Sequence, residues 1–212
     1  YDGVSILRKH ATYHDFLKIA NAEEKTYFVF SGIRNPLDDA VSYYLKLKSD
    51  HKHRFTDPVK LSKRKRLADR IDNQLFDFIK DKDADFPTFF TRFYMLPYNT
   101  WASLSHKQIN YVIRFEYLQE DFAKALELIG VEQTRPLPVV NRTSGKERDF
   151  VSYYTPEIIP RAKRVFGPYM RQWGYDFPPE WGDVGVPWWN QAEFEFVNVF
   201  RRFYWKHLRA YI

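Results

Sequence analysis

The stretch from residue 27 to residue 44 constrains the fold most, because it predicts a strand, a tight turn and a helix in direct succession. Residues 27–33, Tyr-Phe-Val-Phe-Ser-Gly-Ile, form an aromatic and β-branched run that indicates a short buried strand. Arg34-Asn35-Pro36 then breaks this run, and Pro36 suits the first turn of a helix. We therefore expect an α/β fold with Arg34 at the carboxyl edge of the strand, where open α/β sheets bind ligands.

Arg34 and Ser42 are candidate ligands for a phosphate monoester. Ser42 follows Pro36 by about two helical turns, so a hydroxyl is expected near the start of the helix. An arginine offers paired hydrogen-bond donors and a charge that is never lost, which suits a phosphate. The alternative is that Arg34 only caps or pairs at the end of the strand.

Composition limits the size of the fold and the kind of partner. A chain of 212 residues, 44% hydrophobic and 19% aromatic, can bury one substantial core, so we expect a single domain over residues 1–212. The net charge of +6 favours anionic partners: nucleotides, acidic glycans, nucleic acid or anionic lipid. The chain has no cysteine, which fits a reducing compartment, and it has neither a membrane-length apolar run nor a signal segment. These features predict a soluble, cytoplasmic protein.

Hydrophobic spacing extends the alternation of strands and helices along the chain. The predicted elements are a helix beginning around Thr12, a helix carrying Ile71 to Ile79, a helix from Phe86, a strand over 111–118, a helix over 119–129 that ends at Gly130, and a helix from Thr155 to Trp173 that Pro160 and Pro168 interrupt. This order is typical of a parallel sheet.

Two further segments are rich in cations. The polar loop over residues 141–150 contains Arg142 and Lys146, which are candidate anion ligands, with exposed solubilising charge as the alternative. The segment 60–70 is expected to form a solvated helix face, with a rim that attracts a polyanionic acceptor as the alternative. We expect no nucleic-acid partner, because no nucleic-acid-binding motif accompanies the charge. His51 and His53 have no evident third ligand, so no metal site is predicted.

The segment 178–212 is predicted to be an aromatic, helical C-terminal extension. Its stripe at helical spacing comprises Phe194, Val197, Phe200, Phe203, Tyr204, His207, Leu208 and Tyr211. Such a helix must pack against something. We expect it to cover the domain's own core, with a homodimer contact or a membrane-surface contact as alternatives.

At the central motif the chain resembles the sulfotransferases that use 3′-phosphoadenosine 5′-phosphosulfate (PAPS). Their motif for the 3′-phosphate is Arg-(Asn/Asp)-Pro with a Ser eight positions after the Arg, and the matching residues here are Arg34, Asn35, Pro36, Asp38, Ser42, Tyr43 and Tyr44. Asp39 stands where many relatives carry Arg, which changes the local charge. Residues 115–118, Phe-Glu-Tyr-Leu, and residues 153–157, Tyr-Tyr-Thr-Pro-Glu, are similar to two further landmarks of the family.

The resemblance implies a P-loop-like sulfotransferase fold, with a central parallel sheet flanked by helices. It also implies transfer of a sulfuryl group from PAPS to a hydroxyl of a carbohydrate or polysaccharide, either anionic or neutral. By position, Arg34 and Ser42 anchor the 3′-phosphate and Phe115 lies against the adenine, with core packing as the alternative for Phe115. Arg142 and Lys146 lie in the loop that closes over the 3′-phosphate in related enzymes.

His10 is the candidate catalytic base. The stretch Lys9-His10-Ala11-Thr12 is similar to one in bacterial carbohydrate sulfotransferases and to the His-containing stretch of uronyl 2-O-sulfotransferases, where a His acts as base. A neutral imidazole can accept the proton of the acceptor hydroxyl. The alternative is a His that caps a helix or bonds a backbone carbonyl.

Two other classes of function stay open on the sequence. The 212 residues contain no Pro-Lys-x-Gly-Thr-like loop, so the amino-terminal phosphosulfate loop of the family is expected to be missing from this chain. A nonenzymatic protein that binds anionic glycans or nucleotides on the same fold would show this pattern. A phosphoryl-transfer enzyme is the second alternative, but it requires a Walker-type loop and carboxylates for magnesium.

Overall fold

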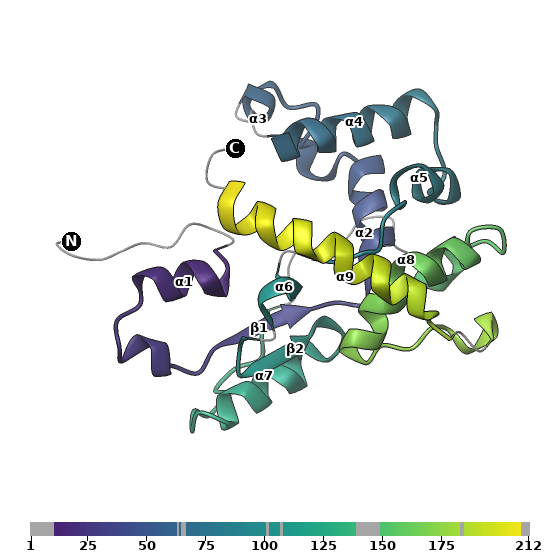
Figure 1. Ribbon diagram of the computed structural model, residues 1–212. Coiled ribbons are helices and arrows are strands. Elements are labelled where there is room, and N and C mark those ends of the chain that lie inside the picture. Colours follow the sequence, from purple (N-terminus) through teal and green to yellow (C-terminus); the bar gives the residue numbers. More distant parts are fainter. Residues whose placement is uncertain are drawn as a thin grey trace. The chain divides into compact units, whose positions relative to one another are not determined.

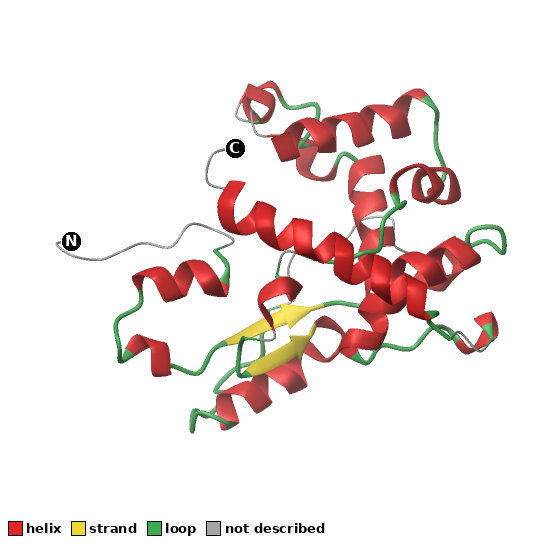
Figure 2. Cartoon of the chain, in the orientation of Figure 1, coloured by secondary structure: helices red, strands yellow, loops and turns green. Residues whose placement is uncertain are grey.

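The computed structural model describes residues 11–62, 64, 67–100, 102–106, 108–138, 149–182 and 185–208. The chain forms two compact units, each built from two segments: unit 1 is Tyr1–Arg34 with Asn99–Pro138, and unit 2 is Asn35–Tyr98 with Val139–Ile212. Within the described residues, helices predominate and the strands belong to unit 1 (Figure 2). That the whole chain acts as a single domain stays a prediction.

The elements of each unit follow the chain order. Unit 1 contains α1 (Tyr13–Ile19), η1 (Glu24–Thr26), β1 (Phe30–Ile33), α6 (Ser103–His106), β2 (Tyr111–Arg114), η3 (Phe115–Tyr117) and α7 (Leu118–Glu127). Unit 2 contains α2 (Pro36–Lys48), η2 (His51–His53), α3 (Pro58–Ser62), α4 (Leu67–Asp81), α5 (Phe86–Phe93), η4 (Phe150–Tyr153), α8 (Ile159–Trp173), η5 (Pro179–Trp181), α9 (Trp188–Phe203) and η6 (Tyr204–Leu208).

A small parallel sheet lies at the centre of unit 1. β1 and β2 pair side by side with Phe30 opposite Tyr111 and Ile33 opposite Arg114 (Figure 1). Helix α7 packs against this sheet: the Phe30 ring lies 6.0 Å from that of Phe122. The predicted parallel pairing is therefore confirmed, and the chain between the two strands is long enough for the crossover that parallel strands require.

The two strands are shorter and more exposed than predicted. The strand expected over 27–33 begins only at Phe30, and the predicted burial holds for Ile33 alone, since Phe30 is 39% exposed. The physical reason is that the described residues add no third strand beside β1, so less covers it. The strand expected over 111–118 ends at Arg114, because Phe115 begins a turn of 3₁₀-helix.

Several predicted helix ends are confirmed by their caps. Asn35 precedes α2 and accepts a hydrogen bond from the Leu37 backbone N–H at 3.0 Å, with Pro36 in the first turn as expected. After α7, Gly130 adopts a left-handed φ of 74°, and the backbone N–H of Val131 bonds the Leu126 carbonyl at 2.9 Å. This is the Schellman arrangement that a glycine after a helix predicts.

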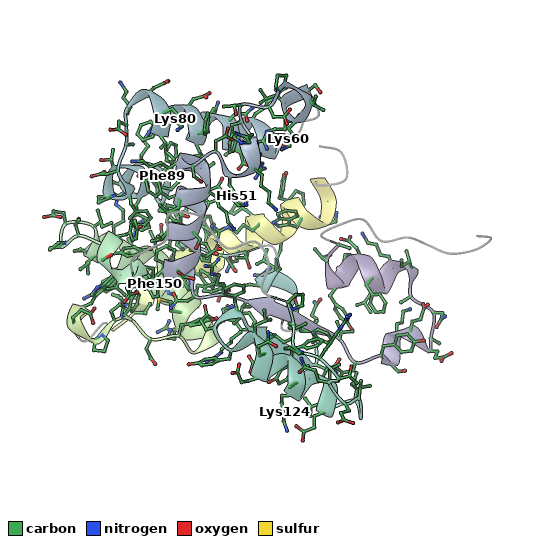
Figure 3. All side chains as sticks on the ribbon, turned by 180° about the vertical axis from the view of Figure 1, so that it is seen from behind. His51, Lys60, Lys80, Phe89, Lys124 and Phe150 are labelled. Carbon is green, nitrogen blue, oxygen red and sulfur yellow. The ribbon has the colours of Figure 1, made fainter. Side chains whose placement is uncertain are left out.

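Unit 2 is organised around an aromatic core. Phe89, on α5, is fully buried (Figure 3), and its ring lies 5.4 Å from that of Tyr44 on α2. Phe90 lies 5.6 Å from Phe166 on α8, which ties α5 to that helix. The Tyr154 hydroxyl donates to the Leu37 carbonyl at 3.0 Å, so a residue 117 positions away holds the first turn of α2.

Helix α8 differs from the prediction at its start and in its middle. It begins at Ile159 rather than at Thr155. Pro160 has no backbone N–H to donate to the carbonyl four residues earlier, so it fits only in the first turn of a helix. The expected interruption at Pro168 is wrong, since the helix continues to Trp173. Gly167 precedes this proline and lacks the Cβ that would clash with its ring, which explains the continuity.

The aromatic stripe of the C-terminal helix packs against unit 2 only in part. Of its described members only Phe194 is fully buried, while Phe200 and Phe203 are more than half exposed. Polar contacts between α9 and α8 accompany this orientation: Arg164 donates to Glu193 at 2.7 Å, and Arg171 donates to Gln191 Oε1 at 2.6 Å. The observed helix begins at residue 188 rather than 191.

Candidate functional site

The carboxyl edge of the sheet brings Arg34 and Phe115 together in unit 1. Arg34 follows β1 directly and Phe115 follows β2 directly, and the parallel register places the two strand ends side by side. The Arg34 guanidinium carbon lies 4.6 Å from the centroid of the Phe115 ring. The predicted position of Arg34 at this edge is confirmed, whereas its contact with Phe115 was not predicted from the sequence.

This pair joins a cation to an accessible aromatic surface. Arg34 is half-buried, and Phe115 is 53% exposed, so Phe115 does not lie in the core, which was the alternative for this residue. A guanidinium over an aromatic ring gains about 0.5–1 kcal/mol and is held in a defined plane. A planar donor fork suits a phosphate, and an exposed ring can stack on a base. The edge therefore combines a cation with an accessible aromatic ring.

Helix α2 carries the other half of the predicted phosphate motif, in unit 2. Asn35, Asp38 and Ser42 follow one another at the i, i+3 and i+7 spacing that places them on one face of the helix. Ser42 is 1% exposed and Asp38 is 8% exposed. Arg34 belongs to unit 1 and Ser42 to unit 2, and each is positioned by its own unit. The role of Ser42 stays a prediction.

Asp39, on α2, has a partner within unit 2. The Tyr98 hydroxyl donates to Asp39 Oδ2 at 2.9 Å, and the Tyr98 backbone N–H bonds the Val165 carbonyl at 2.8 Å. Burial raises the pKa of Tyr98 well above its usual value, and the Asp39 charge raises it further. Tyr98 therefore stays protonated and donates to the carboxylate, which connects the start of α2 to α8.

A partly buried charge cluster beside α2 and α4 was not predicted from the sequence. Asp72 accepts a hydrogen bond from Tyr43 at 2.6 Å and from Arg54 at 2.5 Å, while Arg64 lies 3.6 Å from both Asp69 and Asp72. Burial, followed by the Asp72 hydrogen bond, raises the pKa of Tyr43. Arg64 thus departs from the solvated face expected for segment 60–70, because these carboxylates hold it.

Three predicted site residues lie outside the described residues: His10, Arg142 and Lys146. Their assigned roles stay predictions. Next to His51 in the chain, the Lys52 carbonyl accepts a hydrogen bond from Lys60 Nζ at 2.6 Å. Across the part of the chain that the structure describes, no group of three or more His, Asp or Glu side chains is placed to hold a metal ion. In the same part, no helix combines the length and the apolar character needed to cross a bilayer.

Comparison with known proteins identifies the family. The model described as the sulfotransferase family matches residues 5–174, which is most of the chain. The match includes the edge pair Arg34 and Phe115 as well as Ser42 on α2. No curated protein and no solved structure matched the chain. The chain therefore belongs to the sulfotransferase family.

Proposed function

We propose that this protein transfers the sulfuryl group of PAPS to a hydroxyl of a carbohydrate acceptor, on a P-loop-like α/β fold. Membership of the sulfotransferase family makes the chain a transferase of sulfuryl groups. The observation that carries the choice of donor is the placement of Arg34 at the carboxyl edge of β1, 4.6 Å over the Phe115 ring. A fixed guanidinium beside an exposed ring fits a ligand with both a phosphate and a base.

Each candidate residue has a distinct part in donor binding. Arg34, in unit 1, is the proposed donor of paired hydrogen bonds to the 3′-phosphate. Ser42, in unit 2, is a second proposed donor because of its place in the family motif. Phe115 offers its ring to the adenine. Arg142 and Lys146 contribute positive charge from the loop over residues 141–150. Arginine suits the first role better than lysine would, because its fork is planar and bidentate.

The proposed transfer is an in-line displacement at sulfur. His10 accepts the proton of the acceptor hydroxyl as the hydroxyl oxygen bonds to sulfur and the bond from sulfur to the bridging phosphate oxygen breaks. The sulfate ester and 3′-phosphoadenosine 5′-phosphate are the products, and holding the donor and acceptor in line lowers the entropic part of the barrier. No residue of this chain is assigned to the charge that develops on the leaving phosphate.

An anionic glycan is the acceptor that the charge of the chain favours. The net charge of +6 attracts polyanions over a range of about 10 Å at moderate salt. Lys60 on α3 and Lys80 on α4 add cations to unit 2 (Figure 3). A preference for anionic over neutral glycans that weakens as salt is added would support this choice.

Calorimetric binding of 3′-phosphoadenosine 5′-phosphate tests the donor site. We expect Arg34→Ala to weaken binding by about 100-fold or more and Arg34→Lys by about tenfold. Lysine keeps the positive charge but loses the paired donors of the guanidinium, whereas alanine loses both. Arg135→Ala is the matched control, since Arg135 is an exposed arginine in unit 1. Adenosine 5′-phosphate should bind poorly in every case. Equal binding by the parent chain and Arg34→Ala would overturn the donor-site assignment.

Transfer of labelled sulfate from PAPS to glycans tests the reaction itself. His10→Ala should lose transfer while it keeps nucleotide binding, because a base acts on the acceptor rather than on the donor. A chain that binds the nucleotide through Arg34 but transfers sulfate to no carbohydrate would instead be a nucleotide-binding protein on this fold.

A further inference from the structure

Helix α9 carries its aromatic side chains on the side that faces away from the core of unit 2. We define the α9 outer face as Trp188, Trp189, Ala192, Phe196, Val199, Phe200 and Phe203. All its large members are more than half exposed, from 56% for Val199 to 76% for Trp188. An apolar surface of this kind on a single helix is a mark of an interaction site.

Polar contacts on the opposite side fix this orientation. Asn190 and Asn198 are buried beside Phe194, and α9 contacts α8. Arg201 donates to Asn198 Oδ1 at 3.1 Å and to the Pro97 carbonyl at 2.6 Å. A rotation of the helix that buried the outer face would break these hydrogen bonds and leave buried polar groups unsatisfied, which costs about 1–3 kcal/mol for each group.

The outer face has the spacing of a coiled-coil seam. Its central residues, Trp189, Ala192, Phe196, Val199 and Phe203, follow one another at alternating intervals of three and four positions. Apolar residues at this heptad spacing pack against a second helix, knobs into holes. The neighbouring surface positions carry charge: Glu195 precedes Phe196, and Arg202 precedes Phe203.

We propose that the α9 outer face docks on a second copy of this chain, with the two α9 helices antiparallel about a two-fold axis. In this arrangement Phe196 of one copy meets Val199 of the other, and the small Ala192 meets the large Phe203. Glu195 then lies beside Arg202 of the other copy on both sides of the axis. A parallel pair in register would instead set Ala192 against Ala192 and Phe203 against Phe203.

The size of the face suits such a dimer. The helix is about 24 Å long, which accommodates two heptads of contacts. Fully buried aromatic side chains cover about 150–250 Å² each, so five that are more than half exposed offer on the order of 500 Å². A standard interface takes about 800 Å² from each partner. The α9 outer face would therefore supply most of one side of a symmetric interface.

The oligomeric state of the 212-residue chain in solution tests this proposal. Sedimentation equilibrium over micromolar concentrations should show a dimer. Val199→Glu should raise its dissociation constant by about tenfold or more, because each copy would bury a carboxylate against Phe196 of the other copy, with two like charges near the axis. Val59→Glu is the matched control: Val59 is a 63% exposed valine in helix α3. A monomer at all concentrations, or equal losses in both variants, would overturn the proposal.

An exchange of charges tests the antiparallel arrangement. Glu195→Arg and Arg202→Glu should each weaken the dimer about three- to tenfold, whereas the double variant should return to within about twofold of the parent chain. Circular dichroism should show that all the variants stay folded. A double variant weaker than either single variant would overturn the antiparallel pairing.

Two further results would assign the face to another occupant and overturn the proposal. One is a monomer that sediments with vesicles of phosphatidylcholine and phosphatidylserine and is released by Val199→Glu, since an aromatic helix face can also enter a membrane surface. The other is a monomer in which the α9 amides exchange slowly and Val199→Glu speeds their exchange, which would show that another part of the same chain covers the face.

Discussion

The two compact units differ in how much apolar surface they bury. Unit 2 packs an aromatic core around Phe89 and Phe166, whereas the buried apolar residues described in unit 1 are Ala20, Ile33, Ile113 and Ala125. Most of the hydrophobic stabilisation therefore belongs to unit 2. The edge pair Arg34 and Phe115 lies on the less densely packed unit, as is common for residues that bind ligands. This contrast separates the part that resists unfolding from the part proposed to bind the nucleotide.

The largest expected effect concerns the core of unit 2. Phe89→Ala should lower the free energy of unfolding by about 3–5 kcal/mol, because it leaves a cavity where the ring is fully buried. Phe30→Ala in β1 should cost about 1 kcal/mol, since Phe30 is 39% exposed and its ring lies at the edge of the small sheet, 6.0 Å from that of Phe122. Chemical denaturation followed by circular dichroism measures both values. Equal losses would show that the contrast between the units does not govern stability.

Nucleotide binding should reduce the difference in stability between the two units, because it stabilises unit 1. At 100 times its dissociation constant, a ligand that binds only the folded site adds about 2.7 kcal/mol. We expect 3′-phosphoadenosine 5′-phosphate to slow hydrogen exchange at the amides of β1 and β2 by up to about 100-fold. Arg34→Ala is the control that should remove this protection. Protection confined to α4 and α5 would contradict the assignment of the site to unit 1.

Replacement of one glycine in each unit by alanine tests backbone strain without a change in packing. An added Cβ meets no atom within 4 Å at Gly130 or at Gly185, but only Gly130 has a left-handed φ, of 74°. Gly130→Ala should therefore cost about 1–2 kcal/mol in unit 1. Gly185→Ala in unit 2 should be neutral or slightly stabilising, because it only restricts the unfolded chain. Urea denaturation compares them, and equal effects would contradict the role of Gly130 as a cap.

The smallest expected effect concerns the cap of α5 in unit 2. Thr88 donates from its side chain and its backbone to Asp85, which lowers the pKa of this carboxyl. Because the folded pKa lies below the unfolded value of about 3.9, the stabilisation is present above pH 4 and is lost as the pH falls through the folded pKa. Asp85→Ala should cost about 1 kcal/mol at pH 7 and less at pH 3.

The control for this cap is Asp77→Ala, which removes an exposed carboxylate from the interior of α4. Its free energy of unfolding at pH 7 should stay within about 0.5 kcal/mol of that of the parent chain. A cost for Asp85→Ala that is the same at both pH values would mean that the carboxylate does not act through its charge.

The sequence predicted the features that depend on neighbouring residues. Asn35-Pro36 predicted the start of α2, and Gly130 predicted the end of α7, because caps and breakers act over a few positions. The break at Arg34-Asn35-Pro36 likewise predicted that Arg34 lies at the carboxyl edge of the strand. Local chemistry therefore gave the central strand, turn and helix with an error of a few residues at the strand ends.

Features that depend on distant partners were missed. Neither the contact of Arg34 with Phe115 nor the bond from Tyr98 to Asp39, 59 positions apart, has a local signal in the sequence. The burial of α9 was predicted only in part for a related reason: aromatic periodicity indicates an apolar face, but which residues pack against unit 2 depends on distant partners on α8. The spacing of apolar residues within one helix carries no information about such partners.

The discontinuity of both units determines when the chain can fold during synthesis. β1 pairs with β2 across 81 positions, and Tyr154 closes on Leu37 across 117, so neither unit is complete until its late segment leaves the ribosome. A nascent chain that has reached residue 138 holds all of unit 1 but lacks α8 and its contribution to the aromatic core. Until then α2 and α5 keep apolar surface exposed, which makes this protein a candidate for chaperone binding while it is translated.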